Sequence, residues 1–86
     1  MKILLAEDDP HISVIAKLAL ERLGGHDVTV VSDGEQALNA ALGGTFDLIL
    51  LDEMMPKLNG LNVCKQYLEQ CSHPAPVIFL SAKSQD

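Results

Sequence analysis

The chain has 86 residues, of which 48% are hydrophobic, so it is long enough for one small globular domain and too short for two. Twelve acidic and six basic residues give a net charge of −6, which argues against direct nucleic-acid binding by this segment and is compatible with cation binding. No apolar run approaches the length that crosses a bilayer, and charges come too early for a secretory signal peptide. We therefore expect a single cytoplasmic domain over residues 1–86, without membrane contact.

The first predicted element is a buried strand over Lys2–Ala6, because this stretch is a short apolar run. Acidic residues follow it at once, at Glu7, Asp8 and Asp9. Asp9 before Pro10 is typical of a helix start, since the side chain accepts a hydrogen bond from the first turn and proline fixes φ there. Glu7 and Asp8 have no such local role, and they are candidates for chemistry.

Apolar residues at helical spacing predict a first helix that ends at the glycine pair 24–25. Its predicted buried face consists of Ile12, Ile15, Ala16, Ala19, Leu20 and Leu23. A β-branched run then predicts a second strand over Asp27–Val31, and a second helix is expected over residues 35–42.

The most informative stretch is residues 46–56, which have the sequence FDLILLDEMMP. Its apolar run shows no alternation, which is typical of a strand covered on both faces in a parallel sheet, and it stops at Asp52. A carboxylate at the carboxyl end of a central strand lies where open α/β sheets bind their ligands. Pro56 cannot extend the strand, so we expect the chain to turn just after Asp52 and to form a wall of the site.

Asn59 and Gly60 precede a third predicted helix. Its predicted apolar stripe is Leu61, Cys64, Leu68 and Cys71, with Tyr67 beside it. The two cysteines are too far apart along one helix to form a disulfide, and we expect them to fill the core or a groove. Two prolines follow, and Val77–Leu80 predicts a fourth strand that ends at Ser81.

The alternation of strands and helices predicts a parallel sheet with right-handed crossovers. The carboxyl ends of parallel strands meet at one edge, so Glu7, Asp8, Asp52 and Ser81 should lie together. Clustered carboxylates repel one another unless one takes up a proton or a hard cation such as Mg²⁺ binds. With a metal present, Asp52 could attack a phosphoryl group and Ser81 could hydrogen-bond the product.

Other classes of function fit the residues less well. A phosphohydrolase with an aspartyl nucleophile would want a second acid two residues after Asp52, where Met54 stands. A flavin or nucleotide carrier would need a loop rich in glycine, serine or threonine after the first strand, where acidic residues would repel phosphate. A module that only docks or self-associates remains an alternative, and Lys57 could contact a phosphoryl group or be solvated. We expect a binding module rather than an enzyme.

Several short segments together resemble the response-regulator receiver domain of two-component signalling, over the whole length of the chain. They are EDD at 7–9, DG and AL within 33–38, FDLILLD at 46–52, MP at 55–56, NG at 59–60 and SA at 81–82. The resemblance implies a flavodoxin-like, doubly wound α/β fold with a parallel sheet. It also implies phosphorelay signal transduction, with Asp52 accepting a phosphoryl group from a histidine kinase or phosphotransfer protein and the module switching its output.

The resemblance further assigns roles around Asp52. Mg²⁺ would be bound by Asp8, by Asp52 and by the backbone carbonyl of Met54, with Glu7 acting through water. Ser81 would take the switch position that binds the phosphoryl group, and the small residue beside it, which leaves room for that group, would be Ala82.

The resemblance also implies that the chain is a C-terminally truncated receiver, with four strands and three helices. The family's fifth strand and last two helices would be missing, and so would the lysine at the end of that strand, since Lys83 comes too early. The fourth strand, Val77–Leu80, would then be an exposed apolar edge. We expect self-association through this edge or exchange of elements between chains.

Overall fold

The computed structural model describes residues 1–80, and the predicted positions of Ser81, Ala82 and Lys83 lie outside this part of the chain. In chain order the elements are β1 (Lys2–Ala6), α1 (Pro10–Gly24), β2 (Asp27–Val31), α2 (Gly34–Gly43), β3 (Leu48–Asp52), α3 (Gly60–Gln70) and β4 (Val77–Leu80). This alternation confirms the prediction. Within residues 1–80 no helix is long and apolar enough to span a membrane.

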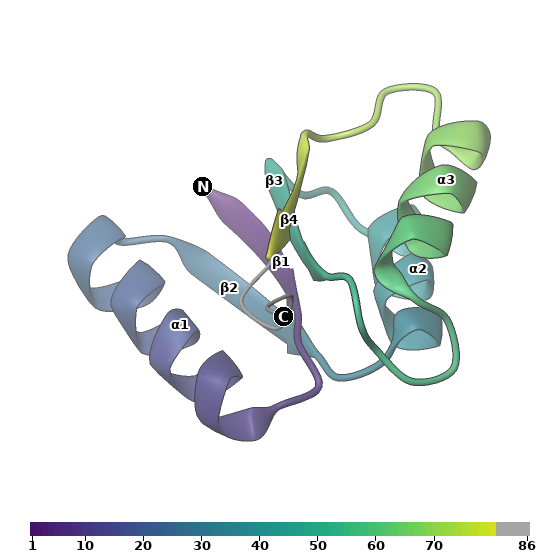
Figure 1. The fold of residues 1–86 in the computed structure, drawn as a ribbon. Helices are drawn as coiled ribbons and strands as arrows, with labels where there is room; N and C mark the ends of the chain where they lie inside the picture. The colour runs from purple at the N-terminus through teal and green to yellow at the C-terminus, as the bar shows by residue number, and fades with distance from the viewer. Residues whose placement is uncertain (81–86) are drawn as a thin grey trace.

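The strands form one parallel sheet in the order β2, β1, β3, β4, which confirms the predicted parallel sheet and places β4 at its edge among the described strands. Ala6 at the end of β1 lies beside Val31 on one side and Leu51 on the other, and Asp52 at the end of β3 lies beside Leu80. Helix α1 covers one face of the sheet, and α2 and α3 cover the other (Figure 1). The carboxyl ends of β1 and β3 therefore lie at the same edge of the sheet.

The larger part of the core lies between the sheet and the pair α2 and α3. Its buried members are Leu4, Ala6, Ala37, Ala41, Ile49, Leu51, Met55, Val63 and Tyr67. Alternate residues of β1 and β3 point into this layer, and Met55 adds a side chain from the chain segment after β3. The chain segment after β3 is therefore anchored in the core next to the edge of the sheet where the acidic residues lie.

Helix α1 buries a narrower face than its sequence predicts. Ala16 and Leu20 pack against Ile3, Leu5 and Val28 of the sheet, as expected. The other predicted contacts are partly wrong, because Ile15 is 69% exposed, Leu23 is 89% exposed and Ala19 is also exposed. Helix α1 packs mainly on β2 and less on β1, so a helix on the flank of the sheet covers only part of its apolar stripe.

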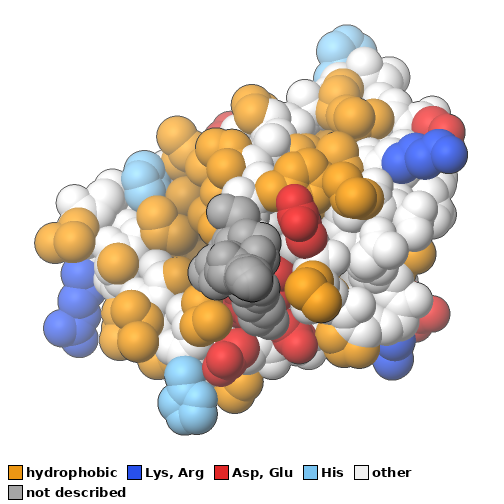
Figure 2. All heavy atoms as spheres, viewed as in Figure 1, with side chains coloured by type: hydrophobic (Ala, Val, Ile, Leu, Met, Phe, Trp, Pro, Cys, Tyr) orange, Lys and Arg blue, Asp and Glu red, His pale blue; other side chains and the backbone are white. Residues whose placement is uncertain are grey.

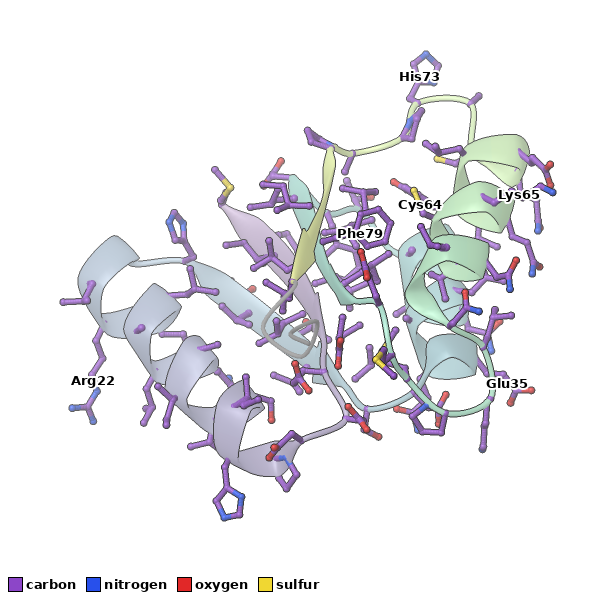
Figure 3. The ribbon with its side chains drawn as sticks, in the orientation of Figure 1. Arg22, Glu35, Cys64, Lys65, His73 and Phe79 are labelled. Carbon is purple, nitrogen blue, oxygen red and sulfur yellow. The ribbon has the colours of Figure 1, made fainter. Side chains whose placement is uncertain are left out.

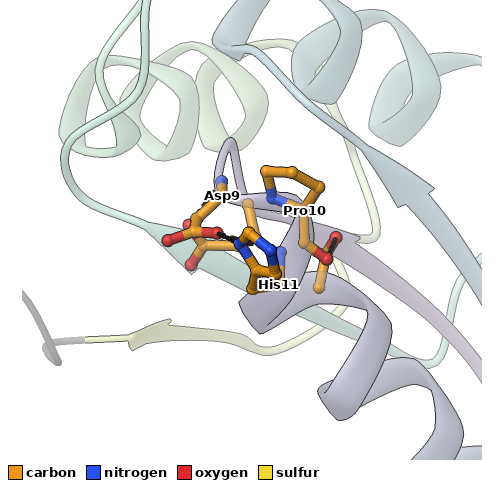
Figure 4. A network of polar contacts seen from close by, with 5 residues as sticks. Asp9, Pro10 and His11 are labelled. Carbon is orange, nitrogen blue, oxygen red and sulfur yellow. Dashed lines mark hydrogen bonds and ion pairs between the residues drawn. The ribbon is translucent and has the colours of Figure 1, made fainter.

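The ends of α1 are set by the residues that the sequence indicates. The side chain of Asp9 accepts a hydrogen bond of 2.9 Å from the backbone N–H of His11, and the His11 ring lies against the same oxygen (Figure 4). At the other end Gly25 has a φ of 65°, a left-handed conformation that glycine adopts without the steric cost of a side chain. The role of Asp9 is thus local, as predicted.

The predicted apolar stripe of α3 is wrong for its two leucines, although Cys64 and Cys71 pack against the core as expected. Val63 and Tyr67 are the large buried residues of this helix, whereas Leu61 is 62% exposed and Leu68 is 51% exposed. Because Val63 and Tyr67 are four positions apart, they share one side of the helix, and the Tyr67 hydroxyl accepts a hydrogen bond of 2.7 Å from the backbone N–H of Ala75. These contacts rotate α3 away from the predicted orientation.

The cysteines lie at the margin of this layer. Cys64 and Cys71 are partly buried free thiols, as expected. Figure 3 shows Cys64 on the side of α3 that faces the sheet, while Lys65 points outward.

Candidate functional site

Acidic side chains converge at the carboxyl edge of the sheet. Glu7 and Asp8 directly follow β1, and Asp52 is the last residue of β3. Since β1 and β3 are neighbours in register, one carboxylate oxygen from each of the three residues lies within 4.8 Å of the others. The sequence therefore predicted correctly that these side chains meet, and Figure 2 shows acidic side chains gathered on this part of the surface.

The three carboxylates differ in their access to solvent. Glu7 is 3% exposed and Asp52 is 2% exposed, whereas Asp8 lies partly open to water. The three carboxylates, two of them buried, bring negative charge together at this edge, and such a cluster attracts a cation. Carboxylate oxygens are the ligands that Mg²⁺ prefers, and a partly open site leaves room for the water molecules that Mg²⁺ retains. The donor set therefore fits a magnesium ion.

Backbone groups orient two of these carboxylates. The N–H of Asp9 donates a hydrogen bond of 3.0 Å to Glu7 Oε2, and the N–H of Met54 donates one of 3.1 Å to Asp52 Oδ1. Each bond links a carboxylate to the chain two residues further on, so the turn after each strand holds the acid at its end. Such bonds fix the orientation of a ligand before it meets a metal or a substrate.

The wall of the site is formed by residues 53–59, here called the site loop, which connect β3 to α3. The chain turns immediately after Asp52, as the sequence predicts. Next to the carboxylates is an open pocket of about 550 Å³. Its lining consists of Asp8, Glu53, Met54, Met55, Pro56, Asn59 and Leu61. Met54, the predicted backbone ligand, thus lies in the wall, with a side chain that is 64% exposed.

The sequence missed the connection between the site loop and α2. The Lys57 ammonium lies 3.7 Å from Asp33 Oδ2. Because the Lys57 side chain is 59% exposed, it is both largely solvated and paired with a carboxylate. Asp33 also caps α2 through a hydrogen bond of 2.8 Å from the N–H of Gln36. A residue of this type before a helix predicts the cap. No sequence pattern indicates the partner of its second oxygen.

The fold and the acidic edge define a class of doubly wound α/β proteins that bind their ligand where the strands end. A family model of the response regulator receiver domain matches residues 3–86. The chain belongs to this family, as the resemblance indicated, and its receiver domain serves in two-component systems.

The curated relatives that the chain matches include bacterial regulators. It is 41% identical over 83 residues to the response regulator ArlR of Staphylococcus saprophyticus, covering 96% of this chain and 36% of that protein. It is 45% identical over 85 residues to the alkaline phosphatase synthesis transcriptional regulatory protein PhoP of Bacillus subtilis, covering 99% of this chain and 35% of that one. The chain thus spans about a third of the length of these relatives.

Solved structures confirm the flavodoxin-like fold. The receiver domain of the Francisella response regulator 1452 aligns with a TM-score of 0.87 and 38% identity, over 98% of this chain and 68% of that one. A chain from the complex of histidine kinase ThkA with response regulator protein TrrA aligns with a TM-score of 0.86 and 32% identity, over 98% and 71%. The receiver domain of sensor histidine kinase PA1611 from Pseudomonas aeruginosa, with magnesium in its active-site cleft, aligns with a TM-score of 0.85 and 32% identity, over 99% and 70%.

Proposed function

We propose that residues 1–86 act as one cytoplasmic receiver unit that accepts a phosphoryl group on Asp52 from the phosphohistidine of a histidine kinase or phosphotransfer protein. The observation that carries the proposal is the cluster of Glu7, Asp8 and Asp52 carboxylates within 4.8 Å at the end of the central strands. The kinase complex among the structural neighbours supports the kind of partner. The net charge of −6 supports a role without direct nucleic-acid contact by this segment.

The proposed ligands of Mg²⁺ are the carboxylates of Asp8 and Asp52 and the backbone carbonyl of Met54, with Glu7 acting through water. The magnesium in the cleft of the PA1611 receiver domain supports this assignment. Bound Mg²⁺ would offset the negative charge of the phosphoryl oxygens during transfer. The chain's own part is to hold three acidic groups in fixed positions through the turns after β1 and β3.

In the proposed transfer a carboxylate oxygen of Asp52 attacks the phosphorus of the phosphohistidine. A phosphorus–oxygen bond forms, the phosphorus–nitrogen bond breaks, and the imidazole leaves and takes up a proton from water. The product is an acyl phosphate on Asp52. Ser81, outside the described residues, would bind the phosphoryl group, and Ala82 beside it would leave room for that group, which couples phosphorylation to the chain after β4.

The decisive experiment incubates the protein with Mg²⁺ and acetyl phosphate, a small phosphodonor, and measures its intact mass. We expect the addition of one phosphoryl group, its loss in Asp52→Asn, and its loss when Mg²⁺ is chelated. Asp47→Asn is the matched control, because Asp47 immediately precedes β3, the strand that ends at Asp52. Its side chain accepts a hydrogen bond from the backbone N–H of Lys2 at the opposite end of the sheet. That variant should be labelled like the unaltered chain.

Labelling of Asp52→Asn, or labelling that continues without a divalent cation, would contradict the assignment of the site. A complete lack of labelling with Mg²⁺ binding intact would favour the alternative function, a domain that only docks or self-associates.

One observation favours self-association as a second candidate function. Strand β4 pairs only with β3 among the described residues, and Ile78 within it is 51% exposed, so Val77–Leu80 offers an apolar edge for strand pairing. The proposal is that two chains associate through this edge. Sedimentation at increasing concentration should show a dimer that Ile78→Lys weakens, because a charged edge resists pairing. A monomer at all concentrations would refute it.

A further inference from the structure

The site loop, residues 53–59, is attached to the amino-terminal end of α2 as well as to its own strand and helix. The backbone N–H of Gly34, the first residue of α2, donates a hydrogen bond of 3.2 Å to the carbonyl oxygen of Pro56. Figure 1 shows the chain after β3 running past the first turn of α2. The wall of the site is therefore connected to an element that contributes no acidic residue to the carboxylate cluster.

The contact at Gly34 leaves no room for a side chain. Gly34 is buried, and a β-carbon built on it would overlap the backbone carbonyl oxygen of Leu58. Any larger residue would therefore have to push the site loop away from α2. The absence of a side chain at this position sets how closely the loop approaches the helix.

A second contact holds the loop in an unusual backbone conformation. Lys57 has a φ of 72°, in the left-handed region that residues other than glycine rarely adopt. Its ammonium lies 3.7 Å from Oδ2 of Asp33, which is 7% exposed and whose other oxygen caps α2. A rare backbone conformation persists when its surroundings hold it, and here the surroundings are Asp33 and Gly34.

We propose that Asp33 and Gly34 are positioning residues for the metal site, acting through the site loop on Met54. This inference rests on the proposed function, in which the Met54 carbonyl binds Mg²⁺. Met54 is also the residue whose N–H orients Asp52, through the 3.1 Å bond to Oδ1. A displacement of the loop would therefore disturb a backbone ligand and a carboxylate ligand together, although neither Asp33 nor Gly34 touches the metal.

The first test compares two glycines of the same helix. Gly34→Ala forces the loop outward, whereas Gly43→Ala, at the far end of α2, places its methyl group in open space. Mg²⁺ affinity is measured by titration of backbone amide NMR signals, which also report whether each variant is folded. We expect Gly34→Ala to weaken Mg²⁺ binding by at least about tenfold, the effect of removing groups that orient metal ligands. Gly43→Ala should bind Mg²⁺ like the unaltered chain.

The second test changes the loop itself and does not depend on how α2 tolerates a methyl group. Lys57→Pro and Lys57→Gly both remove the contact with Asp33, but proline excludes a positive φ and glycine permits it. We expect Lys57→Pro to weaken Mg²⁺ binding by about tenfold or more and Lys57→Gly to weaken it far less. The pair therefore separates the backbone conformation of the loop from the charge of the lysine.

The outcomes distinguish this inference from the proposed function. If the unaltered chain binds no Mg²⁺, the proposed function and this inference fall together. If the unaltered chain binds Mg²⁺ and folded Gly34→Ala and Lys57→Pro bind it equally well, only the positioning role is refuted. Weaker binding in both, with shifted amide signals at residues 53–58 and unchanged signals in β1 and α1, supports the inference. A role in stability alone would lower the melting temperature without changing the affinity of the folded protein for Mg²⁺.

Discussion

The two faces of the sheet are closed to different degrees. On the face covered by α2 and α3, Leu51 and Val63 are each 1% exposed and Tyr67 is 4% exposed. On the face covered by α1, Ile3 and Leu5 are fully buried, but Ile78 on the same sheet is 51% exposed. The layer between the sheet and the helices α2 and α3 is thus sealed from solvent, whereas the face under α1 is partly open.

This difference between the two faces shows which part of the molecule holds the loop beside the carboxylates in place. Met55 of the site loop belongs to the sealed layer with α2 and α3, and Gly34 of α2 contacts the same loop. The face under α1 contributes the capped turn at Asp9 but no part of the loop after β3. We therefore expect substitutions in the layer with α2 and α3 to affect stability and the metal site together, and substitutions of the exposed residues on the face under α1 to affect neither strongly.

The largest expected loss of stability is at Leu51 of β3, and it should clearly exceed the loss at its neighbour Leu50. Leu51 is 1% exposed and packs in the layer with α2 and α3, whereas Leu50 is partly buried and packs on the α1 side. Leu51→Ala should cost about 3 kcal/mol, because it leaves a cavity in a buried layer, and Leu50→Ala should cost about 1 kcal/mol, because Leu50 is only partly buried. Urea unfolding followed by circular dichroism measures both. Equal losses would contradict the difference between the faces.

A smaller loss of stability is expected when the hydroxyl of Tyr67, the buried tyrosine of α3, is removed. Tyr67→Phe removes the acceptor of the 2.7 Å bond from the Ala75 N–H and should cost about 1 kcal/mol. The loss should come from the connection between α3 and β4 rather than from packing, since the ring remains. Val63→Ala serves as the packing control on the same side of the helix. A Tyr67→Phe variant as stable as the unaltered chain would show that Ala75 finds another partner.

The same tyrosine predicts a dependence of stability on pH. Burial raises the pKa of Tyr67 above its ordinary value of 10.0, the Ala75 N–H lowers it in part, and the Cys71 side chain raises it. The folded state therefore holds the phenol proton more tightly than the unfolded state. This contribution to stability is fully present below pH 10 and is lost as pH rises through the raised pKa.

Two measurements check the sign. Tyr67 is the only tyrosine of the chain, and there is no tryptophan, so the ultraviolet absorbance of tyrosinate reports its titration alone. The midpoint of this titration should be higher in the folded chain than in urea. The free energy of unfolding of Tyr67→Phe should decline less at alkaline pH than that of the unaltered chain. A midpoint below that of the unfolded chain would reverse the sign and refute the prediction.

Much of this molecule could be predicted from local patterns. The order of the elements, the helix starts at Asp9 and Asn59 and the meeting of Glu7, Asp8 and Asp52 all follow from apolar runs, capping residues and the geometry of a parallel sheet. Each of these depends on residues close in sequence or on the rule that parallel strands end at the same edge.

The features that could not be predicted depend on distant partners. The period of α3 is compatible with the stripe through Leu61 and Leu68, but its contacts with the sheet and with Ala75 bury Val63 and Tyr67 instead. Lys57, which pairs with Asp33, has a positive φ, which its residue type disfavours. Local preference is outweighed in both places by tertiary contacts.

The smallest expected effect tests the open face directly. Ile15 belongs to the apolar stripe of α1 that the sequence predicts to be buried, yet it is 69% exposed, so Ile15→Gln should change the free energy of unfolding by no more than about 0.5 kcal/mol. Leu20→Gln is the matched control, because Leu20 lies on the same helix and packs against the sheet, and it should be clearly destabilising. A large loss for Ile15→Gln in the monomer would mean that α1 packs more deeply than its exposure indicates. A loss that appears only at high protein concentration would instead place Ile15 in a contact between chains.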